Sequence, residues 1–262
     1  FSYSYVPHQC VVELSSQVNA AGADFVLLCA EHTMSKSKVP VVSICAVRTG
    51  CGKSQTTRRV VQLLKDAGKR VVAIRHPMPY GDLVKQAVQR FGELADLDKH
   101  ECTIEEREEY EPHIVNGIVC YAGVDYGAIL AEAEKEADVI VWDGGNNDLP
   151  FYAPDLEIVV ADPHRAGHEL TYYPGLTNTL RADAVIINKV DTADAEDVME
   201  LRRTLREINP DARIIEAASP IFVDDPEIIE GKRVLAIEDG PTLTPGEMEV
   251  AGAVLPAERF GA

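Results

Sequence analysis

Basic residues are scarce in this chain relative to acidic ones. Its 262 residues include 43 Asp and Glu but only 25 Lys and Arg, which gives a formal net charge of −18. A nucleic-acid-binding protein needs a basic face to neutralise phosphates, so this balance argues against DNA or RNA as the main partner. A polyanionic substrate would have to find a locally basic pocket within an unfavourable overall field.

Long apolar runs, paired cysteines and repeats are also missing. No apolar stretch approaches the roughly 18–20 residues that a membrane-spanning helix needs. The six cysteines are scattered without a Cys-x-x-Cys pair, so neither a zinc site nor a disulfide framework is predicted. The apolar content of 46% is enough for a full core. We therefore expect a globular, cytoplasmic protein with no membrane partner.

Continuous apolar runs alternate with amphipathic segments after Pro40. Strands are predicted at residues 41–47, 70–74, 139–142, 156–160, 184–187, 213–215 and 234–237. Helical faces are predicted from Val60, Leu64 and Ala67, with Gly68 as the cap, and from the stripe Val198, Leu201, Leu205 and Ile208. Strands that are apolar throughout are typical of a sheet covered on both faces. Their alternation with helices predicts an α/β fold with a doubly wound, mostly parallel sheet.

A glycine-rich segment lies between the predicted strand at 41–47 and the helix that follows it. Glycines let successive backbone N–H groups turn towards phosphate oxygens, and the helix N-terminus adds partial positive charge. In such a P-loop, Lys53 contacts the β- and γ-phosphates, and the Ser54 hydroxyl binds Mg²⁺. The predicted nucleotide-binding residues of the loop are Thr49, Gly50, Cys51, Gly52, Lys53, Ser54 and Gln55.

The loop departs from the common pattern G-x-x-x-x-G-K-[ST], because Val47 stands at the first glycine. It matches instead the variant K-G-G-x-G-K-[ST] of dimerising P-loop proteins, with Arg48 at the signature lysine and Thr49 at a glycine. In that class the extra cation often crosses to the partner's nucleotide. We therefore predict a homodimer, and a catalytic role for Arg48 in stabilising the transferring phosphate. The alternative for Arg48 is a surface charge without a role.

Asp143 ends the apolar strand at 139–142 and is followed by Gly144 and Gly145. This is the form of a Walker B segment, so Asp143 is predicted to be catalytic and to hold Mg²⁺ together with Ser54. The two glycines would permit close approach to the γ-phosphate. An ordinary turn after a strand is the alternative.

Asn188, Lys189 and Asp191 form an N-K-x-D motif at the end of the strand at 184–187. In GTPases the aspartate of this motif accepts hydrogen bonds from guanine, and the lysine lies along the base. Adenine offers its amino group to the same carboxylate. The predicted cofactors are therefore ATP with Mg²⁺, with GTP open as an alternative, and a plain polar loop is the non-functional reading.

Two loops concentrate cations in this acidic chain. The first carries Arg75 and His76, and the second carries His164, Arg165 and His168. Both follow predicted strands, where open α/β sheets bind their ligands, and arginine forks and histidine donors suit phosphate groups. We predict that these five residues bind a small phosphorylated substrate, with Arg107 and His113 as further candidates.

Six segments together resemble the cyclic 2,3-diphosphoglycerate synthetases: residues 45–54, 75–82, 105–110, 142–148, 164–168 and 188–191. The likeness spans essentially the whole chain. It implies an ATP-dependent ligase that closes a phosphoanhydride ring on 2,3-diphosphoglycerate and releases ADP and phosphate, with the five loop cations holding that substrate. Two readings stay open beside it: a GTP-binding protein of the same P-loop group with a regulatory or chaperone role, and a relative that keeps the fold without this reaction.

The predicted fold is thus α/β, with a doubly wound, mostly parallel sheet of the P-loop NTPase class, preceded by the remnant of a smaller α/β unit. Residues 1–38 are predicted to be the end of that N-terminal unit and its linker, because a helical face at 12–21 and a buried strand at 23–28 precede a polar segment. Residues 39–240 are the predicted P-loop domain, and 241–262 the start of a truncated C-terminal segment. The resemblance implies longer relatives, so we expect a fragment of a larger protein.

Overall fold

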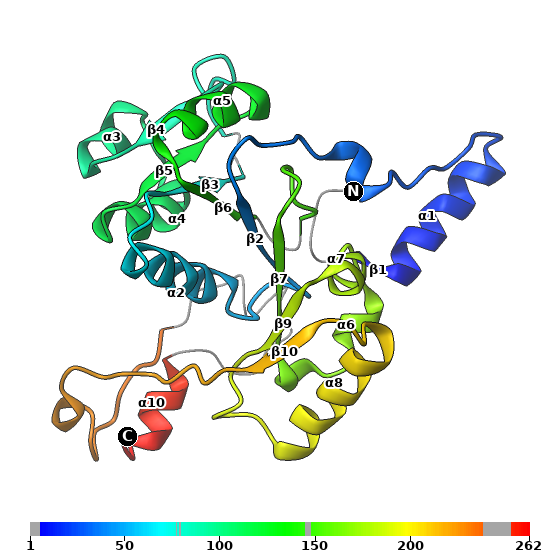
Figure 1. Cartoon of the computed structure of the whole chain (residues 1–262). Coiled ribbons are helices and arrows are strands. Elements are labelled where there is room, and N and C mark those ends of the chain that lie inside the picture. Colours follow the sequence, from blue (N-terminus) through cyan, green and yellow to red (C-terminus); the bar gives the residue numbers. More distant parts are fainter. Residues whose placement is uncertain (1–5, 77, 79, 145–147, 238–252) are drawn as a thin grey trace.

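A mostly parallel sheet forms the centre of the molecule (Figure 1). The computed structural model describes residues 6–76, 78, 80–144, 148–237 and 253–262. Within them, one sheet has eight strands in the order β10-β9-β7-β2-β6-β3-β5-β4, in which only the β4–β5 pair is antiparallel. Its strands are β2 (Val41–Ala46), β3 (Val71–Arg75), β4 (Gln89–Phe91), β5 (Val119–Ala122), β6 (Val139–Asp143), β7 (Leu156–Ala161), β9 (Ala184–Ile187) and β10 (Arg213–Glu216).

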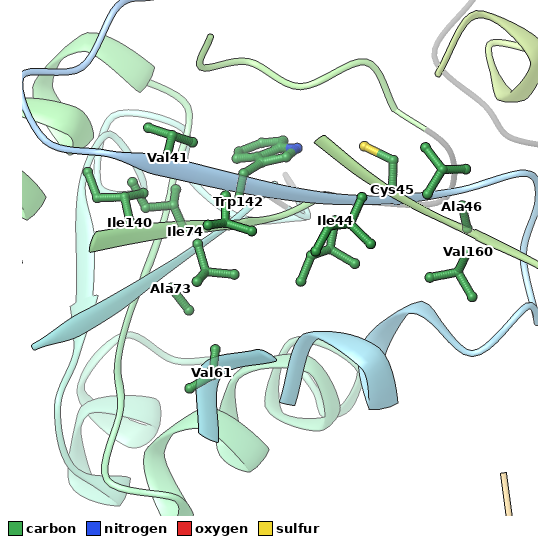
Figure 2. Close-up of a cluster of buried hydrophobic side chains, with 14 of the residues drawn as sticks. Val41, Ile44, Cys45, Ala46, Val61, Ala73, Ile74, Ile140, Trp142 and Val160 are labelled. Carbon is green, nitrogen blue, oxygen red and sulfur yellow. The ribbon is translucent and has the colours of Figure 1, made fainter. Parts of the chain in front are cut away.

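Helices cover both faces of this sheet. The principal ones are α2 (Lys53–Asp66), α3 (Leu94–Lys99), α4 (Ile104–Val115), α5 (Tyr126–Glu136), α6 (His168–Thr171), α7 (Gly175–Arg181) and α8 (Ala195–Ile208). Figure 2 shows Val61 of α2 and the ring of Trp142 on opposite sides of β2. On the Trp142 side, Phe151 packs against this ring and against Tyr126 of α5. The sheet is therefore doubly wound, as its continuous apolar strands predict.

Shorter elements lie outside this core. The helix α1 (His8–Ala20) extends away from the sheet in Figure 1, and the short strands β1 (Val6–Pro7) and β8 (Tyr172–Tyr173) pair antiparallel. The remaining elements are the 3₁₀ turns η1 (Ala30–Thr33), η2 (Pro163–Arg165) and η3 (Pro226–Ile228) and the helix α10 (Val254–Arg259). No helix among the described residues is both long and apolar enough to cross a membrane.

Most of the predicted elements are confirmed, and two predicted strands are wrong. The helix with Gly68 at its end and the helix with the Val198–Ile208 stripe are present, as are the six predicted strands that begin between residues 41 and 213. Residues 23–28 and 234–237, by contrast, form no strand. Val26 is 71% exposed and Leu235 is 85% exposed, so these apolar runs lack a neighbouring strand to pair with. The strands β4 and β5 were not predicted.

The division into domains stays a prediction. Within the predicted linker at 31–38 the structure has the end of η1 and a single parallel bridge from Ser35 to Tyr152. Of the predicted C-terminal segment, residues 241–252 lie outside the described residues, and 254–259 form α10. The arrangement that matters for function is the parallel sheet, because the carboxyl ends of β2, β3, β6, β7 and β9 meet at one edge and bring their loops together.

The packing of α8 on the sheet gives a direct test of the fold. Leu205 is 1% exposed on this helix, whereas Met199 is 62% exposed. We expect Leu205→Ala to lower the free energy of unfolding by about 2–5 kcal/mol, because it removes buried methyl groups and leaves a cavity. Met199→Ala, the control on the same helix, should change it by about 0.5 kcal/mol or less. Urea unfolding of both variants measures this, and equal losses would contradict the packing.

Candidate active site

The predicted P-loop joins β2 to α2 and has the backbone that its glycines allow. Gly50 and Gly52 have φ values of 84° and 98°, and Gly52 is the N-cap of α2. A Cβ atom at Gly52 would lie 2.1 Å from the Asn188 amide nitrogen, so no larger residue fits there. Asn188 Nδ2 donates to the Cys51 carbonyl at 2.9 Å, and Lys189 Nζ donates to the Gly50 carbonyl at 2.7 Å. Two residues of the N-K-x-D motif therefore brace the loop.

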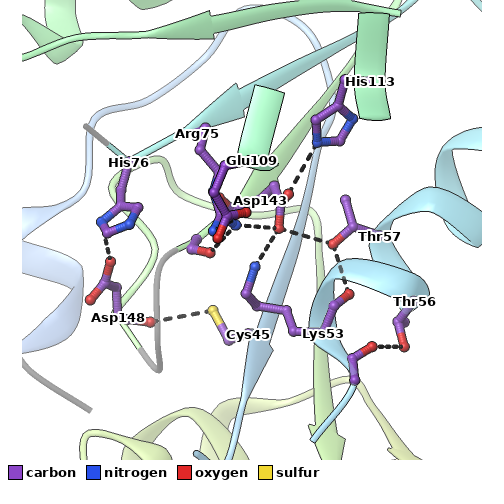
Figure 3. Close-up of polar contacts among 12 residues, drawn as sticks. Cys45, Lys53, Thr56, Thr57, Arg75, His76, Glu109, His113, Asp143 and Asp148 are labelled. Carbon is purple, nitrogen blue, oxygen red and sulfur yellow. Dashed lines mark hydrogen bonds and ion pairs between the residues drawn. The ribbon is translucent and has the colours of Figure 1, made fainter. Parts of the chain in front are cut away.

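The carboxylate of Asp143 is the centre of a buried ion cluster at the end of β6 (Figure 3). Its Oδ1 atom lies 2.5 Å from Lys53 Nζ and 3.0 Å from Arg75 Nη1, and it accepts a bond from Thr57 Oγ1 at 3.0 Å. Its Oδ2 atom lies 3.1 Å from His113 Nε2. All five side chains are at least nine-tenths buried. The lysine of the predicted P-loop and the aspartate of the predicted Walker B segment are thus in direct contact.

Arg75 extends this cluster from β3 to α4. Its Nη2 atom lies 2.5 Å from Glu109 Oε2, and its Nη1 atom donates to the Gly144 carbonyl at 2.9 Å. Glu109 and His113 are four residues apart on α4, so they occupy neighbouring positions on one helix face. The helix therefore supplies one anion and one imidazole to the same buried centre.

The charges in this cluster shift one another's pKa values. Burial alone would raise the pKa of the Asp143 carboxyl, but the Arg75 and Lys53 cations and His113 hold it well below its usual value. Burial and the Arg75 cation lower the pKa of Lys53, against the opposing effect of Asp143. Asp143 is therefore a carboxylate at neutral pH, and it stabilises two buried cations.

His76 follows Arg75 at the same edge. Its Nδ1 atom lies 3.3 Å from Asp148 Oδ2, and the Asp148 carbonyl accepts a bond from Cys45 Sγ at 3.3 Å. Burial lowers the pKa of His76 from 6.5 to about 3, and the Arg75 and Lys53 cations add to the lowering. His76 is consequently a neutral imidazole at the edge of the Asp143 cluster.

The second cationic loop lies on the other side of the P-loop. Asp162, at the end of β7, pairs with Arg165 at 3.2 Å and with Lys189 at 2.7 Å. Arg165 also contacts Cys51 Sγ at 3.5 Å, and His164 lies 3.0 Å from the Thr192 hydroxyl. In the sheet, β2 and β6 lie between β7 and β3. The two predicted substrate loops therefore lie on either side of the P-loop strand, and their joint binding of one substrate stays a prediction.

The two further candidates for substrate binding, Arg107 and His113, lie in different parts of the structure. His113 lies in the Asp143 cluster, whereas Arg107 pairs with Asp98 towards solvent, away from Asp143. Gly145, named with Gly144 in the Walker B segment, lies outside the described residues.

Arg48 is held inside its own chain. It is 2% exposed, its guanidinium carbon lies 4.3 Å from the centre of the Tyr172 ring, and its Nη1 atom donates to the Tyr172 hydroxyl at 3.1 Å. His168 Nδ1 lies 3.1 Å from the same Nη1 atom. The alternative of a surface charge is therefore wrong for Arg48. Its side chain anchors this end of the loop to Tyr172 and His168, and its catalytic role stays a prediction.

A cavity of about 650 Å³ adjoins the last residue of the N-K-x-D motif. It is lined by the Asp191 carboxylate and by apolar groups that include Pro220, Ile221, Leu255 and Phe260. Asp191 Oδ1 accepts from the Ser219 backbone N–H at 2.8 Å, and the Ser219 hydroxyl donates to Gln55 of α2 at 2.9 Å. Glu258 and Arg259 also line this cavity, so its lining is part apolar and part charged. A purine could pack on the apolar part and donate to the Asp191 carboxylate from an amino group, which both adenine and guanine carry.

Mg²⁺ would be bound here by few protein atoms. Within the described residues, no group of three or more His, Cys, Asp or Glu side chains forms a metal cage. Nucleotide-bound Mg²⁺ takes most of its ligands from phosphates and water, with one or two protein oxygens. Ser54, half-buried in the first turn of α2, and the Asp143 carboxylate are oxygen donors of the right kind. The predicted pair therefore fits the ion.

Several residues of the site were not predicted. Thr57 reaches Asp143 from one turn beyond Lys53, Glu109 binds Arg75, and Asp162 joins the two cations beside the P-loop. A spacing of four residues on the helix after Lys53 is the one signal that points to Thr57. Glu109 lies in the segment 105–110 that carries part of the family resemblance, but nothing there indicated a pairing with Arg75, and Asp162 was given no role.

Comparison with known proteins relates the chain to two kinds of synthetase. Arginine synthetase ArcE of Thermococcus kodakarensis is 64% identical over all 262 residues, which span 58% of that protein. A cyclic 2,3-diphosphoglycerate synthetase of the same organism is 24% identical over 217 residues, covering 74% of this chain and 49% of that protein. One from Pyrococcus furiosus is 22% identical over 237 residues, covering 82% and 53%. The chain thus spans about half the length of the curated relatives it matches.

No family model matches the chain. Among solved structures, LpxK from Aquifex aeolicus in complex with ATP has a TM-score of 0.46 at 19% identity, covering 68% of this chain and 54% of that one. The predicted likeness to cyclic 2,3-diphosphoglycerate synthetases is present, and it is more distant than the likeness to the arginine synthetase.

The neutral state of His76 can be tested by titration. The pKa of His76 is about 3 in the folded protein and lies below the ordinary value of 6.5. Below pH 6.5 the unfolded chain therefore binds a proton at His76, whereas the folded protein does not. The free energy of unfolding should therefore fall by roughly 1.6 kcal/mol as the pH drops from 6.5 to about 5, and His76→Gln should not show this loss. The NMR signal of the His76 imidazole is identified as the one that is missing from the spectrum of His76→Gln. In the wild-type protein its chemical shift should not change across this pH range. A titration midpoint near 6.5 would contradict the burial.

Proposed function

We propose that the protein is an ATP-dependent synthetase that activates an acceptor oxygen by phosphoryl transfer and forms arginine. The assignment of arginine as the product rests on the 64% identity to an arginine synthetase over all 262 residues. The observation that supports phosphoryl transfer is the contact between Lys53 of the P-loop and Asp143 at the end of β6. The protein is on this account an enzyme that uses ATP and Mg²⁺.

The ion cluster prepares the P-loop for phosphate. Lys53 is held by Asp143 at 2.5 Å, and we expect it to exchange this partner for the β- and γ-phosphates when ATP binds. Asp143 keeps Arg75, His113 and Thr57 after this exchange, so its carboxylate does not become an unpaired buried charge. Bound Mg²⁺ would neutralise charge on the transferring phosphoryl group, with Ser54 and Asp143 as its protein ligands.

Arg75 and His76 stand where the acceptor must approach. Both follow β3, next to the Asp143 end of β6, and Arg75 supplies a buried positive charge beside Lys53 that can stabilise the charge of the transferred group. The imidazole of His76 is neutral and adds no positive charge there. Its pKa of about 3 makes it a weak proton acceptor, so we assign it hydrogen bonding to the acceptor rather than proton transfer. We assign the phosphoryl-transfer side of the P-loop to these two residues.

We assign the remaining predicted residues to nucleotide binding. His164, Arg165 and Lys189 lie on the opposite side of the P-loop, and Asp191 lines the cavity of about 650 Å³. We propose that Asp191 accepts from the amino group of the base and that Asn188 and Lys189 hold the loop for the phosphates. Arg48, supported by His168 and Tyr172, contributes fixed positive charge next to the loop. Its variant motif is the ground on which we also propose a homodimer.

Arginine as the product constrains the chemistry of the acceptor. Its guanidinium carbon carries three nitrogens, so a precursor with one oxygen on that carbon is a ureido amino acid, citrulline. The γ-phosphoryl group of ATP would be transferred to this oxygen with release of ADP. Ammonia would then add to the carbon, and phosphate would leave with the former ureido oxygen. The same division into activation and displacement describes ring closure on 2,3-diphosphoglycerate, where a neighbouring phosphate is the nucleophile.

Synthesis of cyclic 2,3-diphosphoglycerate is the second candidate, supported by relatives of 22–24% identity. Its substrate carries several negative charges and needs converging cations. The structure separates the Arg75 and His76 pair from the His164 and Arg165 pair, which favours a less charged acceptor. A GTP-dependent switch rests on the N-K-x-D motif alone, and nucleotide preference separates it from both synthetases.

An isotope-transfer assay tests the proposed reaction. The protein is incubated with ATP, Mg²⁺, ammonia and citrulline whose ureido oxygen is a heavy isotope, and arginine and phosphate are analysed by mass spectrometry. We expect arginine to form and the heavy oxygen to appear in phosphate. Lys53→Ala should reduce the rate about a hundredfold or more, whereas Lys69→Ala, an exposed lysine just beyond the same helix, should not.

Two results would overturn this proposal. ATP hydrolysis without arginine would remove the product assignment, and arginine whose formation leaves phosphate unlabelled would remove the activation step. If a cyclic phosphoanhydride instead appears in the phosphorus NMR spectrum with 2,3-diphosphoglycerate, the second candidate takes its place.

A further inference from the structure

A second cavity, of about 410 Å³, lies between the loop that follows β3, the strand β4, the helix α3 and the first turn of α4. Tyr80, Asp82, Lys85, Gln86, Lys99 and Glu106 are among the side chains that line it. None of these residues belongs to the P-loop, the Asp143 cluster or the first cavity, beside Asp191. The second cavity is therefore distinct from the nucleotide site.

Two buried hydrogen-bond acceptors form part of its lining. Glu106 is 2% exposed and Gln86 is 8% exposed. Gln86 Nε2 donates to Glu106 Oε1 at 3.2 Å, and Glu106 Oε2 accepts from the Thr103 backbone N–H at 2.8 Å. Gln86 Oε1 is buried without a hydrogen-bond partner in the described part of the chain. A buried acceptor in this state costs free energy unless a ligand supplies a donor.

The charges around the cavity have both signs. Asp82, Glu101 and Glu106 are acidic, and Lys85 and Lys99 are basic, with both lysines exposed. A polyanion such as 2,3-diphosphoglycerate would meet the buried Glu106 carboxylate and be repelled. A ligand with an ammonium group and a carboxylate matches the arrangement, because its ammonium can donate to Glu106 and Gln86 while its carboxylate faces the lysines.

The helix α4 connects this cavity with the Asp143 cluster. Glu106 lines the cavity, Glu109 pairs with Arg75, and His113 contacts Asp143. Seven residues of α-helix rise about 10 Å. A linear amino acid whose chain bonds are each about 1.5 Å long spans most of that length when a hydrogen bond is added at each end.

We propose that this cavity binds the α-amino acid end of the acceptor, with Glu106 and Gln86 accepting hydrogen bonds from its α-ammonium group. The ureido end then points along α4 towards Arg75 and Lys53, where the phosphoryl group is transferred. The identity of the acceptor rests on the proposed function, whereas the preference for an ammonium group rests on the cavity itself. Lys85 and Lys99 face the α-carboxylate from the cavity mouth.

A comparison of two ligands, each measured with the wild-type protein and with variants, tests this assignment. Calorimetry measures the binding of arginine, and of the arginine analogue that lacks only the α-amino group, to the protein with Mg²⁺ and a non-hydrolysable ATP analogue. The variants are Glu106→Gln, which can still accept the Thr103 N–H bond, and Gln86→Leu. The control is Glu105→Gln, an exposed neighbour on the same helix. Thermal unfolding checks that each variant is folded.

We expect Glu106→Gln to weaken arginine binding about tenfold or more, because a charge-assisted bond is lost. It should leave binding of the analogue without the amine almost unchanged, and Glu105→Gln should change neither. Equal weakening of both ligands, or no weakening of arginine binding, would overturn the proposal. So would a wild-type protein that binds no amino acid.

The isotope assay separates this outcome from that of the proposed function. Arginine synthesis by a Glu106→Gln variant with an unchanged KM for citrulline would overturn the cavity assignment and leave the reaction standing. Binding of arginine that depends on Glu106, in a protein that forms no arginine from citrulline, would overturn the reaction and leave the cavity as an amino-acid site.

Discussion

The site depends on one buried carboxylate with several partners. Asp143 lies at the end of a strand that is buried along its whole length, and its charge is compensated by Lys53, Arg75 and His113, which come from three different elements. Removal of one member would leave the others as uncompensated charges in a low-dielectric interior. This constraint fixes α2, β3 and α4 relative to β6, and with them the P-loop and the loop after β3.

The same constraint explains how an acidic protein can bind a nucleotide. With a net charge of −18, its overall field repels ATP, so attraction has to come from short-range groups. Lys53 and Arg75 are buried cations whose electrostatic effect is not screened by water, and the P-loop adds backbone N–H groups and the N-terminus of α2. The acidic residues of the chain do not weaken this local site, because salt screens exposed charges over about 10 Å.

The sequence predicted the strands of the sheet and the P-loop better than the contacts between individual side chains. Continuous apolar runs identified most strands of the parallel sheet, and the glycines with Lys53 identified the P-loop, because these patterns reflect local backbone needs. The two wrong strands, at 23–28 and 234–237, have apolar sequence but pair with no strand within the described part of the chain. Pairing between strands is a tertiary property, so periodicity alone cannot reveal it.

The candidate site shows the same limit. The motifs single out Lys53 and Asp143 separately, and only the structure shows their contact. Whether Arg75, His76, His164, Arg165 and His168 bind one substrate stays a prediction, because β7 and β3 lie on opposite sides of β2 and β6. The sequence indicated neither the pairing of Glu109 with Arg75 nor the bond from Gln86 to Glu106, since these contacts join residues that are distant along the chain.

The central claim is that Lys53 is held by Asp143 until a nucleotide phosphate replaces it. The measurement that tests it most directly is a crystal structure of the protein with Mg²⁺ and a non-hydrolysable ATP analogue. The account predicts that Lys53 Nζ leaves Asp143 for the β- and γ-phosphate oxygens, while Arg75 and His113 keep their contacts with Asp143. A nucleotide bound away from the loop at Gly50 and Gly52, or a Lys53–Asp143 pair unchanged beside bound phosphates, would contradict it.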